Sequence, residues 1–170
     1  MIILFILFLV ILILLVFSSV YAVRAAAELA KTDYKSNTNL DRAYKWLVYA
    51  SIIGWIGVGL VIFGIILSLY LGSSPGGILS FFTLAVIISL GVLCALGWDD
   101  INNSTKKGSN IDTAKKYVMI STLTSIIGGM VLSGLFIYIS FIKSKKIIYV
   151  DPYGKIINDS ENPKILESNN

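Results

Sequence analysis

The chain has no histidine and a single cysteine among its 170 residues. With one cysteine, a disulfide within the chain cannot form. Without histidine, neither a Cys/His metal site nor a Cys–His or Ser–His catalytic pair can be built. We therefore expect no metal, no cofactor and no catalytic site, and we interpret Cys94 as a small packing residue.

Charge is also scarce, at 14% of residues, whereas 56% are hydrophobic. No charged side chain occurs in four long runs, 1–23, 47–71, 78–98 and 117–142. Each run is long enough to cross a bilayer core of about 30 Å as a helix. The sequence therefore predicts an all-α membrane protein with a four-span transmembrane bundle over 1–142. The net charge of +4 fits basic flanks at a membrane better than nucleic-acid binding.

The first run could be a secretory signal, but it lacks a basic start and exceeds the usual apolar length. We interpret it as a retained span that, having few small residues, faces lipid more than the second run does. Its helix is expected to continue to Lys31, and the segment Lys35–Asn39 breaks it. Thr38 or Asn39 is expected to cap the next helix. The two long helices are thus predicted to form a hairpin, 24–46, that protrudes from the bilayer.

Lys and Arg are distributed unevenly among the connections. Loops 24–46 and 98–116 are basic, whereas the turn 72–77 has no charge. This pattern predicts both basic loops on the cytosolic side and both termini opposite. The lysines at 143, 145 and 146 oppose that orientation.

Small residues at steps of three and four form stripes that allow helices to approach closely in a membrane. On 47–71 the stripe also includes Val61, and its packing residues are Ala50, Gly54, Gly57, Gly64 and Ser68. On 78–98 the pair is Gly91 and Ala95. On 117–142 strict fourfold spacing, which favours a right-handed crossing, joins Ser121, Ser125, Gly129 and Ser133. Spans 78–98 and 117–142 are the expected partners of the 47–71 stripe.

The segment 143–170 is predicted to be a soluble tail with a β-hairpin at 147–157. Asp151, Pro152 and Gly154 favour a type I turn at its tip. A lone two-stranded hairpin is marginal in water, so this one is expected to be loose or to add to the sheet of a partner. The candidate partner-binding residues are Ile147, Tyr149, Val150, Pro152, Tyr153 and Ile156.

The spans carry no ionisable residue except Cys94 and tyrosines, which argues against a pump or coupled transporter. The pair Asp99–Asp100 could hold a divalent ion, but a role at a helix end is commoner. An enzyme is therefore not expected. A channel stays open as an alternative, since hydroxyls could line a path in an oligomer; these belong to Ser121, Thr122, Thr124 and Ser125.

Residues 20–60 resemble a known class of protein. An alanine-rich segment, 25–30, precedes Asp33-Tyr34, and Ala43-Tyr44 leads into Ile53-Gly54-Trp55. This arrangement resembles small multi-span membrane proteins of nucleocytoplasmic large double-stranded DNA viruses. The resemblance implies a minor capsid-associated protein of an internal, ER-derived virion membrane.

We therefore expect a structural protein that organises a membrane beneath a capsid shell. Its expected partners are the lipid bilayer and neighbouring membrane or capsid proteins within a larger assembly, with no nucleic acid and no small-molecule substrate. The alternatives are a small oligomeric channel or holin-like protein, and an assembly or trafficking protein of a cellular membrane.

Overall fold

The architecture is all-α. The computed structural model describes residues 2–71, 77–144, 149–150 and 156–157. Its four long helices are, in chain order, α1 (Ile2–Ala30), α2 (Thr38–Leu71), α3 (Gly77–Asn102) and α4 (Ser109–Ser144). Each contains a stretch long and apolar enough to cross a membrane, as the charge-free runs predict.

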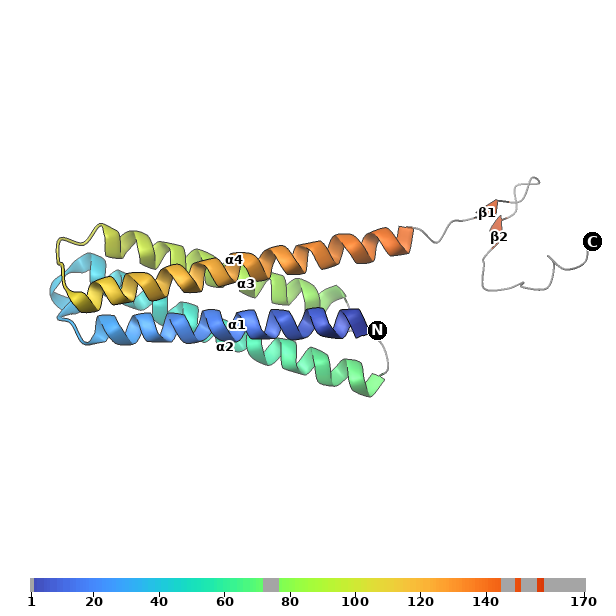
Figure 1. Ribbon diagram of the computed structural model, residues 1–170, viewed down its shortest axis with the longest axis horizontal. Helices are drawn as coiled ribbons and strands as arrows, with labels where there is room; N and C mark the ends of the chain where they lie inside the picture. Colours follow the sequence, from blue (N-terminus) through green and yellow to red (C-terminus); the bar gives the residue numbers. More distant parts are fainter. Residues whose placement is uncertain (1, 72–76, 145–148, 151–155, 158–170) are drawn as a thin grey trace, which may run out of the picture. The chain divides into compact units, whose positions relative to one another are not determined.

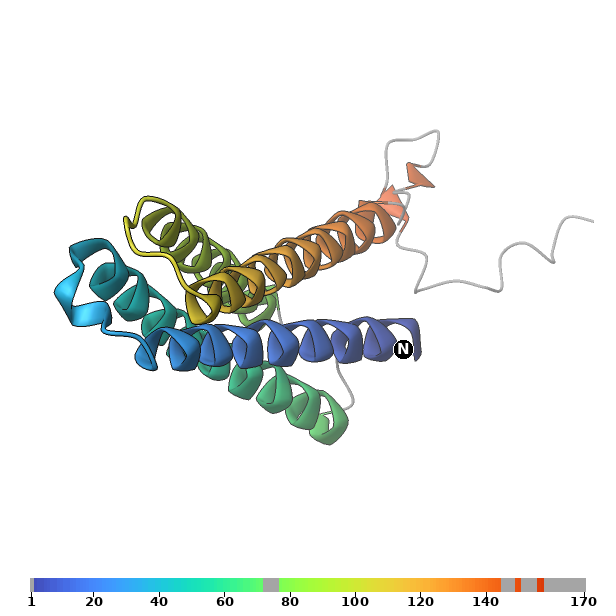
Figure 2. The same ribbon diagram turned by 60° about the vertical axis from the view of Figure 1, so that its left-hand side comes forward.

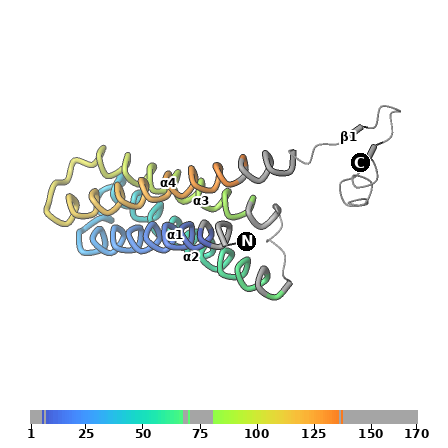
Figure 3. The backbone as a smooth tube through the Cα atoms, turned by 45° about the vertical axis from the view of Figure 1, so that its right-hand side comes forward, coloured from blue at the N-terminus to red at the C-terminus, as the bar shows by residue number. Residues whose placement is uncertain are grey.

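The chain divides into two compact units, Met1–Leu135 and Phe136–Asn170. Within the first unit the helices run side by side along a common direction (Figure 1). The turned view in Figure 2 shows α2 crossing α1 obliquely. The backbone tube in Figure 3 shows the α1–α2 and α3–α4 connections at one end, where the two basic loops meet.

The core of the first unit follows one repeat on all four helices. Buried positions on α4 step alternately by three and four, through 111, 114, 118, 121, 125, 128, 132 and 135. The same alternation is present on α3, through 83, 87, 90, 94, 97 and 101. An average step of 3.5 residues is typical of left-handed bundles with interdigitating side chains. The right-handed crossing expected from fourfold spacing on α4 is therefore not the packing mode.

Helix α1 is buried at least as much as α2, which corrects the expectation that the first span faces lipid more than the second. One side of it is buried in the same repeat, through Phe8, Ile11, Leu15, Ser18, Ala22, Ala25 and Leu29. The other side exposes Ile13 and Phe17. Because nearly all of this span is large and apolar, its composition does not show which side is packed.

The boundary between α1 and α2 is fixed by side-chain caps. Thr32 Oγ1 donates to the Leu29 carbonyl at 2.6 Å, which satisfies a free carbonyl at the end of α1. A short 3-10 turn, η1 (Tyr34–Ser36), follows. Asn37 then caps α2, since its side-chain oxygen accepts from the Asn39 and Leu40 amides at 3.0 and 3.2 Å. The expected caps, Thr38 and Asn39, are one and two residues too late.

The second unit contains the end of α4 and two short strands. Strands β1 (Tyr149–Val150) and β2 (Ile156–Ile157) pair antiparallel, with Tyr149 opposite Ile157 and Val150 opposite Ile156. The predicted turn at Asp151–Gly154 lies outside the described residues, as do Ile147, Pro152 and Tyr153. The expected boundary between bundle and tail, at 142/143, stays a prediction.

Candidate helix-packing core and polar end

The small-residue stripe of α2 lies in the centre of the first unit. Ala50 is fully buried, Val61 is 1% exposed, and Gly54, Gly57 and Gly64 are buried. The side chain of the sixth stripe residue, at 68, lies outside the described part of the chain. A single face of α2 therefore carries the close contacts.

This face packs between α1 and α3. A Cβ added at Gly54 would lie 3.0 Å from Ser19 Cβ and closer still to Ser19 Oγ, on α1. A Cβ added at Gly57 would lie 2.6 Å from Val86 Cγ1, on α3. Both glycines are required because neighbouring helices occupy the space of a side chain. The expected partners of the stripe were α3 and α4. Of these two, only α3 contacts the glycines, and the second partner is α1.

Helix α4 is attached to α1 by hydroxyl groups. Ser18 Oγ donates to the Ser121 carbonyl at 2.8 Å, and Ser121 Oγ donates to the Ser18 carbonyl at 2.8 Å. The two hydroxyl oxygens are 3.0 Å apart. Both serines are fully buried, and Cys94 Sγ on α3 lies 3.2 Å from Ser121 Oγ. Since the Ser121 proton is directed to Ser18, the Cys94 thiol is the donor in the third contact.

A second hydroxyl contact joins α4 to α3. Ser125 Oγ donates to the Ile87 carbonyl at 2.7 Å. Gly91 gives this serine room, because a Cβ at Gly91 would lie 3.0 Å from Ser125 Oγ. A Cβ at Gly129 would meet Ile87 Cγ2 at an ordinary 3.6 Å. The α4 stripe therefore contacts α1 and α3.

Two of the candidate packing residues lie off these contacts. Ala95 on α3 and Ser133 on α4 are exposed. Four residues of helix turn by about 400°, so strict fourfold spacing drifts away from a contact line that averages 3.5 residues. Ser133 Oγ instead donates to the Gly129 carbonyl of its own helix at 2.8 Å.

The fissure between α1, α3 and α4 is narrow. It leaves no room for a water molecule. Its lining is mostly apolar, with hydroxyls that are already bonded: Leu14, Leu15, Ser18, Ile87, Thr124, Ser125 and Gly128. Thr124 Oγ1 returns a hydrogen bond to the Ile120 carbonyl at 2.9 Å. The first unit is thus closely packed at this level.

Hydrogen bonds and ion pairs join the two basic loops into one polar end. Asn39 Nδ2 donates to the Asn103 carbonyl at 2.8 Å, and Asn37 Nδ2 to Thr105 Oγ1 at 3.3 Å. Lys106 Nζ donates to the Asp33 carbonyl at 2.8 Å and lies 3.4 Å from its carboxylate. The α1–α2 and α3–α4 loops therefore behave as one surface.

Some of the charges at this end are paired across the loops or along a helix. The hydroxyl of Ser36 and then the charge of Lys106 lower the pKa of Asp33 from its ordinary 3.8. Asp100 pairs with Arg42 at 3.2 Å and accepts from Trp46 Nε1 at 3.1 Å. The carboxylate at the end of α3 thus holds the start of α2.

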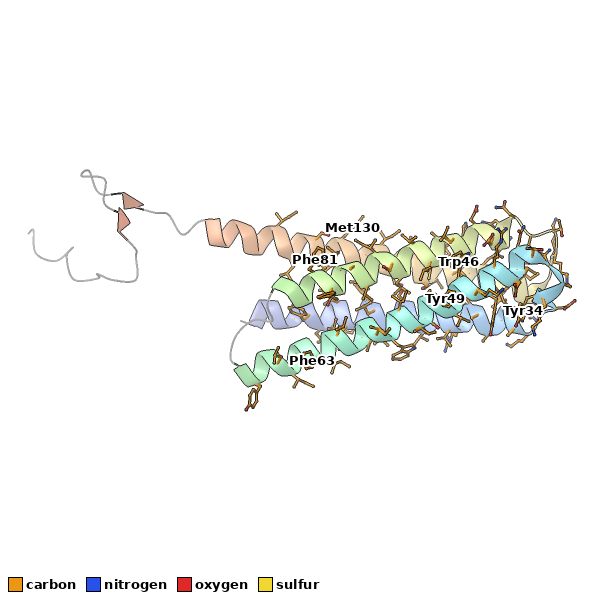
Figure 4. All side chains as sticks on the ribbon, turned by 180° about the vertical axis from the view of Figure 1, so that it is seen from behind. Tyr34, Trp46, Tyr49, Phe63, Phe81 and Met130 are labelled. Atoms are coloured by element: carbon orange, nitrogen blue, oxygen red, sulfur yellow. The ribbon has the colours of Figure 1, made fainter. Side chains whose placement is uncertain are left out.

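The outer surface of the bundle is apolar, as a lipid-facing surface should be. Figure 4 labels Phe63, Phe81 and Met130 along the helices and Tyr34, Trp46 and Tyr49 near the loop end. Phe63, Phe81 and Met130 are all more than half exposed. Aromatic residues near the loop end match the belts found where membranes meet water.

Several contacts were missed by the sequence reasoning. Ser18 and Ser19 are the only serines in the run 1–23, and that isolated polar pair was an available signal. Gly97 was also missed, although a Cβ there would lie 3.3 Å from Leu47 side-chain carbons on α2. Within the described residues, no cluster of three or more His, Cys, Asp or Glu side chains could hold a metal.

No protein-family model, no curated protein and no solved structure matches the chain.

Proposed function

We propose that this chain is a structural multi-pass membrane protein that anchors or organises a membrane against a protein shell. One observation carries the proposal. The hydroxyls at membrane depth on α4, those of Ser121 and Ser125, bond to α1 and α3 in the interior of the bundle. Such bonds stabilise one arrangement of helices, which suits an anchor.

The joined loops and the tail are the proposed contact surfaces. In this proposal, the hairpin 24–46 stands outside the bilayer, and its end is made firm by the contacts of Asn39 and Lys106 across the loops. The tail 143–170 adds a second contact, through β pairing with a partner's sheet. By the resemblance of residues 20–60, the shell is a viral capsid and the membrane lies inside the virion; in a cell, the same role would serve membrane assembly.

The test is whether the chain stays with the shell when lipid is removed. Particles carrying the full chain would be stripped with mild detergent, and the sedimenting shell would be assayed for the protein. We expect the full chain to remain and a chain that ends after Lys146 to be released. Release of both chains in equal measure would contradict the anchor.

Flux measurements separate this function from the channel alternative. Purified full chain would be reconstituted in liposomes, and ion conductance would be recorded. We expect no conductance above that of empty liposomes. Reproducible conductance that Ser125→Ala alters would favour the holin-like channel instead, because Ser125 would then line a conducting path.

A further inference from the structure

We propose that the outer face of α1 and α4, near the loop end, binds anionic phospholipid headgroups. We call this surface the basic face and define it by Arg24 and Lys116 together with Tyr21 and Tyr117. The proposal requires only that the four helices span a membrane. It does not depend on the anchoring role.

The charges of the basic face stand at the depth of lipid headgroups. Arg24 is the first charged residue after the run 1–23, and Lys116 is the last before the run 117–142. The two therefore mark the same boundary on neighbouring antiparallel helices. Six residues deeper than Arg24, or about 9 Å of helix, Ser18 bonds to Ser121 in the interior.

Aromatic rings make this a continuous surface across the two helices. The rings of Tyr21 and Tyr117 lie 5.7 Å apart between their centroids. The Arg24 guanidinium lies 5.8 Å from the centroid of the Tyr21 ring. One turn deeper, Phe17 lies 6.3 Å from Tyr21 and is half exposed. A phosphate at Arg24 would thus have its acyl chain beside Phe17.

The cations of the basic face lack acidic partners. In the described part of the chain, Arg24 and Lys116 make no ion pair, whereas both cations of α2 are paired. Asp112 is the acidic residue one turn from Lys116 on α4, and it makes no contact within ion-pair distance. The positive charge on this side is therefore left for a ligand.

Anionic phospholipid meets each of these requirements. Its phosphate and acidic headgroup complement the two cations, tyrosines favour the interfacial depth, and its chains match the exposed apolar side of α1. A zwitterionic lipid brings its own cation and would compete less well. The basic face is thus a selective surface for negatively charged lipid.

The experiment compares spin-labelled phosphatidylserine with spin-labelled phosphatidylcholine around the full chain in phosphatidylcholine bilayers. Electron paramagnetic resonance gives their relative association constants. The double variant Arg24→Gln, Lys116→Gln should lower the preference for phosphatidylserine about fivefold per cation at low salt. The matched control, Arg42→Gln with Lys45→Gln, removes the same charge from paired residues on α2 and should change the preference by less than about twofold.

The charge-retaining variant Arg24→Lys, Lys116→Arg guards against a loss through misfolding and should keep the preference. Equal losses in the double variant and its α2 control would overturn the proposal, since net charge alone would then act. An unselective wild-type chain, with the two lipids associating equally, would overturn it as well. Retention on a protein shell is measured in a separate experiment. The lipid-binding proposal and the anchoring proposal can therefore each fail without the other.

Discussion

Ser18 and Ser121 each bond to the backbone of the other, with both hydroxyl-to-carbonyl distances at 2.8 Å. The arrangement brings α1 and α4 close at a point where neither helix offers a glycine. Both carbonyls lie within their own helices. The contact therefore adds hydrogen bonds between α1 and α4 without breaking the backbone hydrogen bonds of either helix. It is the polar centre of the bundle.

Removing the two hydroxyls should weaken the bundle in two separate steps. Ser18→Ala and Ser121→Ala each remove one donor, and the acceptor of each lost bond is a backbone carbonyl that the other substitution leaves in place. Hydrogen bonds between membrane helices average about 0.6 kcal/mol, so we expect each substitution to cost about 0.6–1.7 kcal/mol and the double variant to cost about the sum of the two. Reversible unfolding in detergent micelles, followed by circular dichroism, measures the losses. Unchanged stability of both single variants would contradict the two bonds.

Gly54→Ala should destabilise the bundle by about 1–3 kcal/mol in the same unfolding assay, because overpacking forces neighbours apart. The new Cβ would lie 3.0 Å from Ser19 Cβ. Gly59→Ala is the matched control on the same helix, since nothing lies within 4 Å of a Cβ there. It should be neutral or slightly stabilising through helix propensity.

Rescue distinguishes this clash from a general effect on α2. Ser19→Gly removes the side chain that a new methyl at position 54 would meet. Combined with Gly54→Ala, it should recover most of the lost stability. A double variant no better than Gly54→Ala alone would show that the contact with α1 is not the cause.

The stripe of α3 offers a second comparison. Gly91→Leu should destabilise the fold by a few kcal/mol, because a Cβ at Gly91 already lies 3.0 Å from Ser125 Oγ. Ala95→Leu should be tolerated to within about 0.5 kcal/mol, because Ala95 is exposed. Thermal unfolding of the two variants in one detergent decides the matter. Equal losses would place both residues in the packed core.

The ion pair between the loops predicts a pH dependence. The pKa of Asp33 is lowered, so its contact with Lys106 stabilises the folded loop end above the unfolded pKa. That stabilisation is lost as the pH falls through the folded value. Titration of the Asp33 carboxyl carbon by NMR should give a midpoint below 3.8. Lys106→Met should raise it, and Lys107→Met should not.

The four helices could be predicted because a run without charge has one stable form in lipid. The packed side of α2 could also be predicted, since glycines at positions 54 and 57 stand out among large residues. Its partners could not. A small-residue stripe shows that something approaches closely, but the approaching residues, Ser19 and Val86, lie far apart in the chain.

The α3 and α4 stripes show a second limit of sequence reasoning. Spacing alone gave four equivalent residues on α4, yet Ser125 is buried and Ser133 is exposed. The buried positions of the packed helices recur on average every 3.5 residues. Residues spaced strictly by four therefore coincide with the buried positions over only two or three turns. The contacts of the polar end were even harder to predict than the helix contacts, because they join side chains of two loops that are separate in the sequence.

The order of synthesis gives the Ser18–Ser121 bond a further consequence. Before α4 is in place, Ser18 has no fourth helix to receive its proton, and a hydroxyl in a helix can then bond to its own backbone. The arrival of α4 supplies the Ser121 carbonyl and hydroxyl as partners. A chain that stops before residue 121 would therefore lack the bonds that attach α1 to α4.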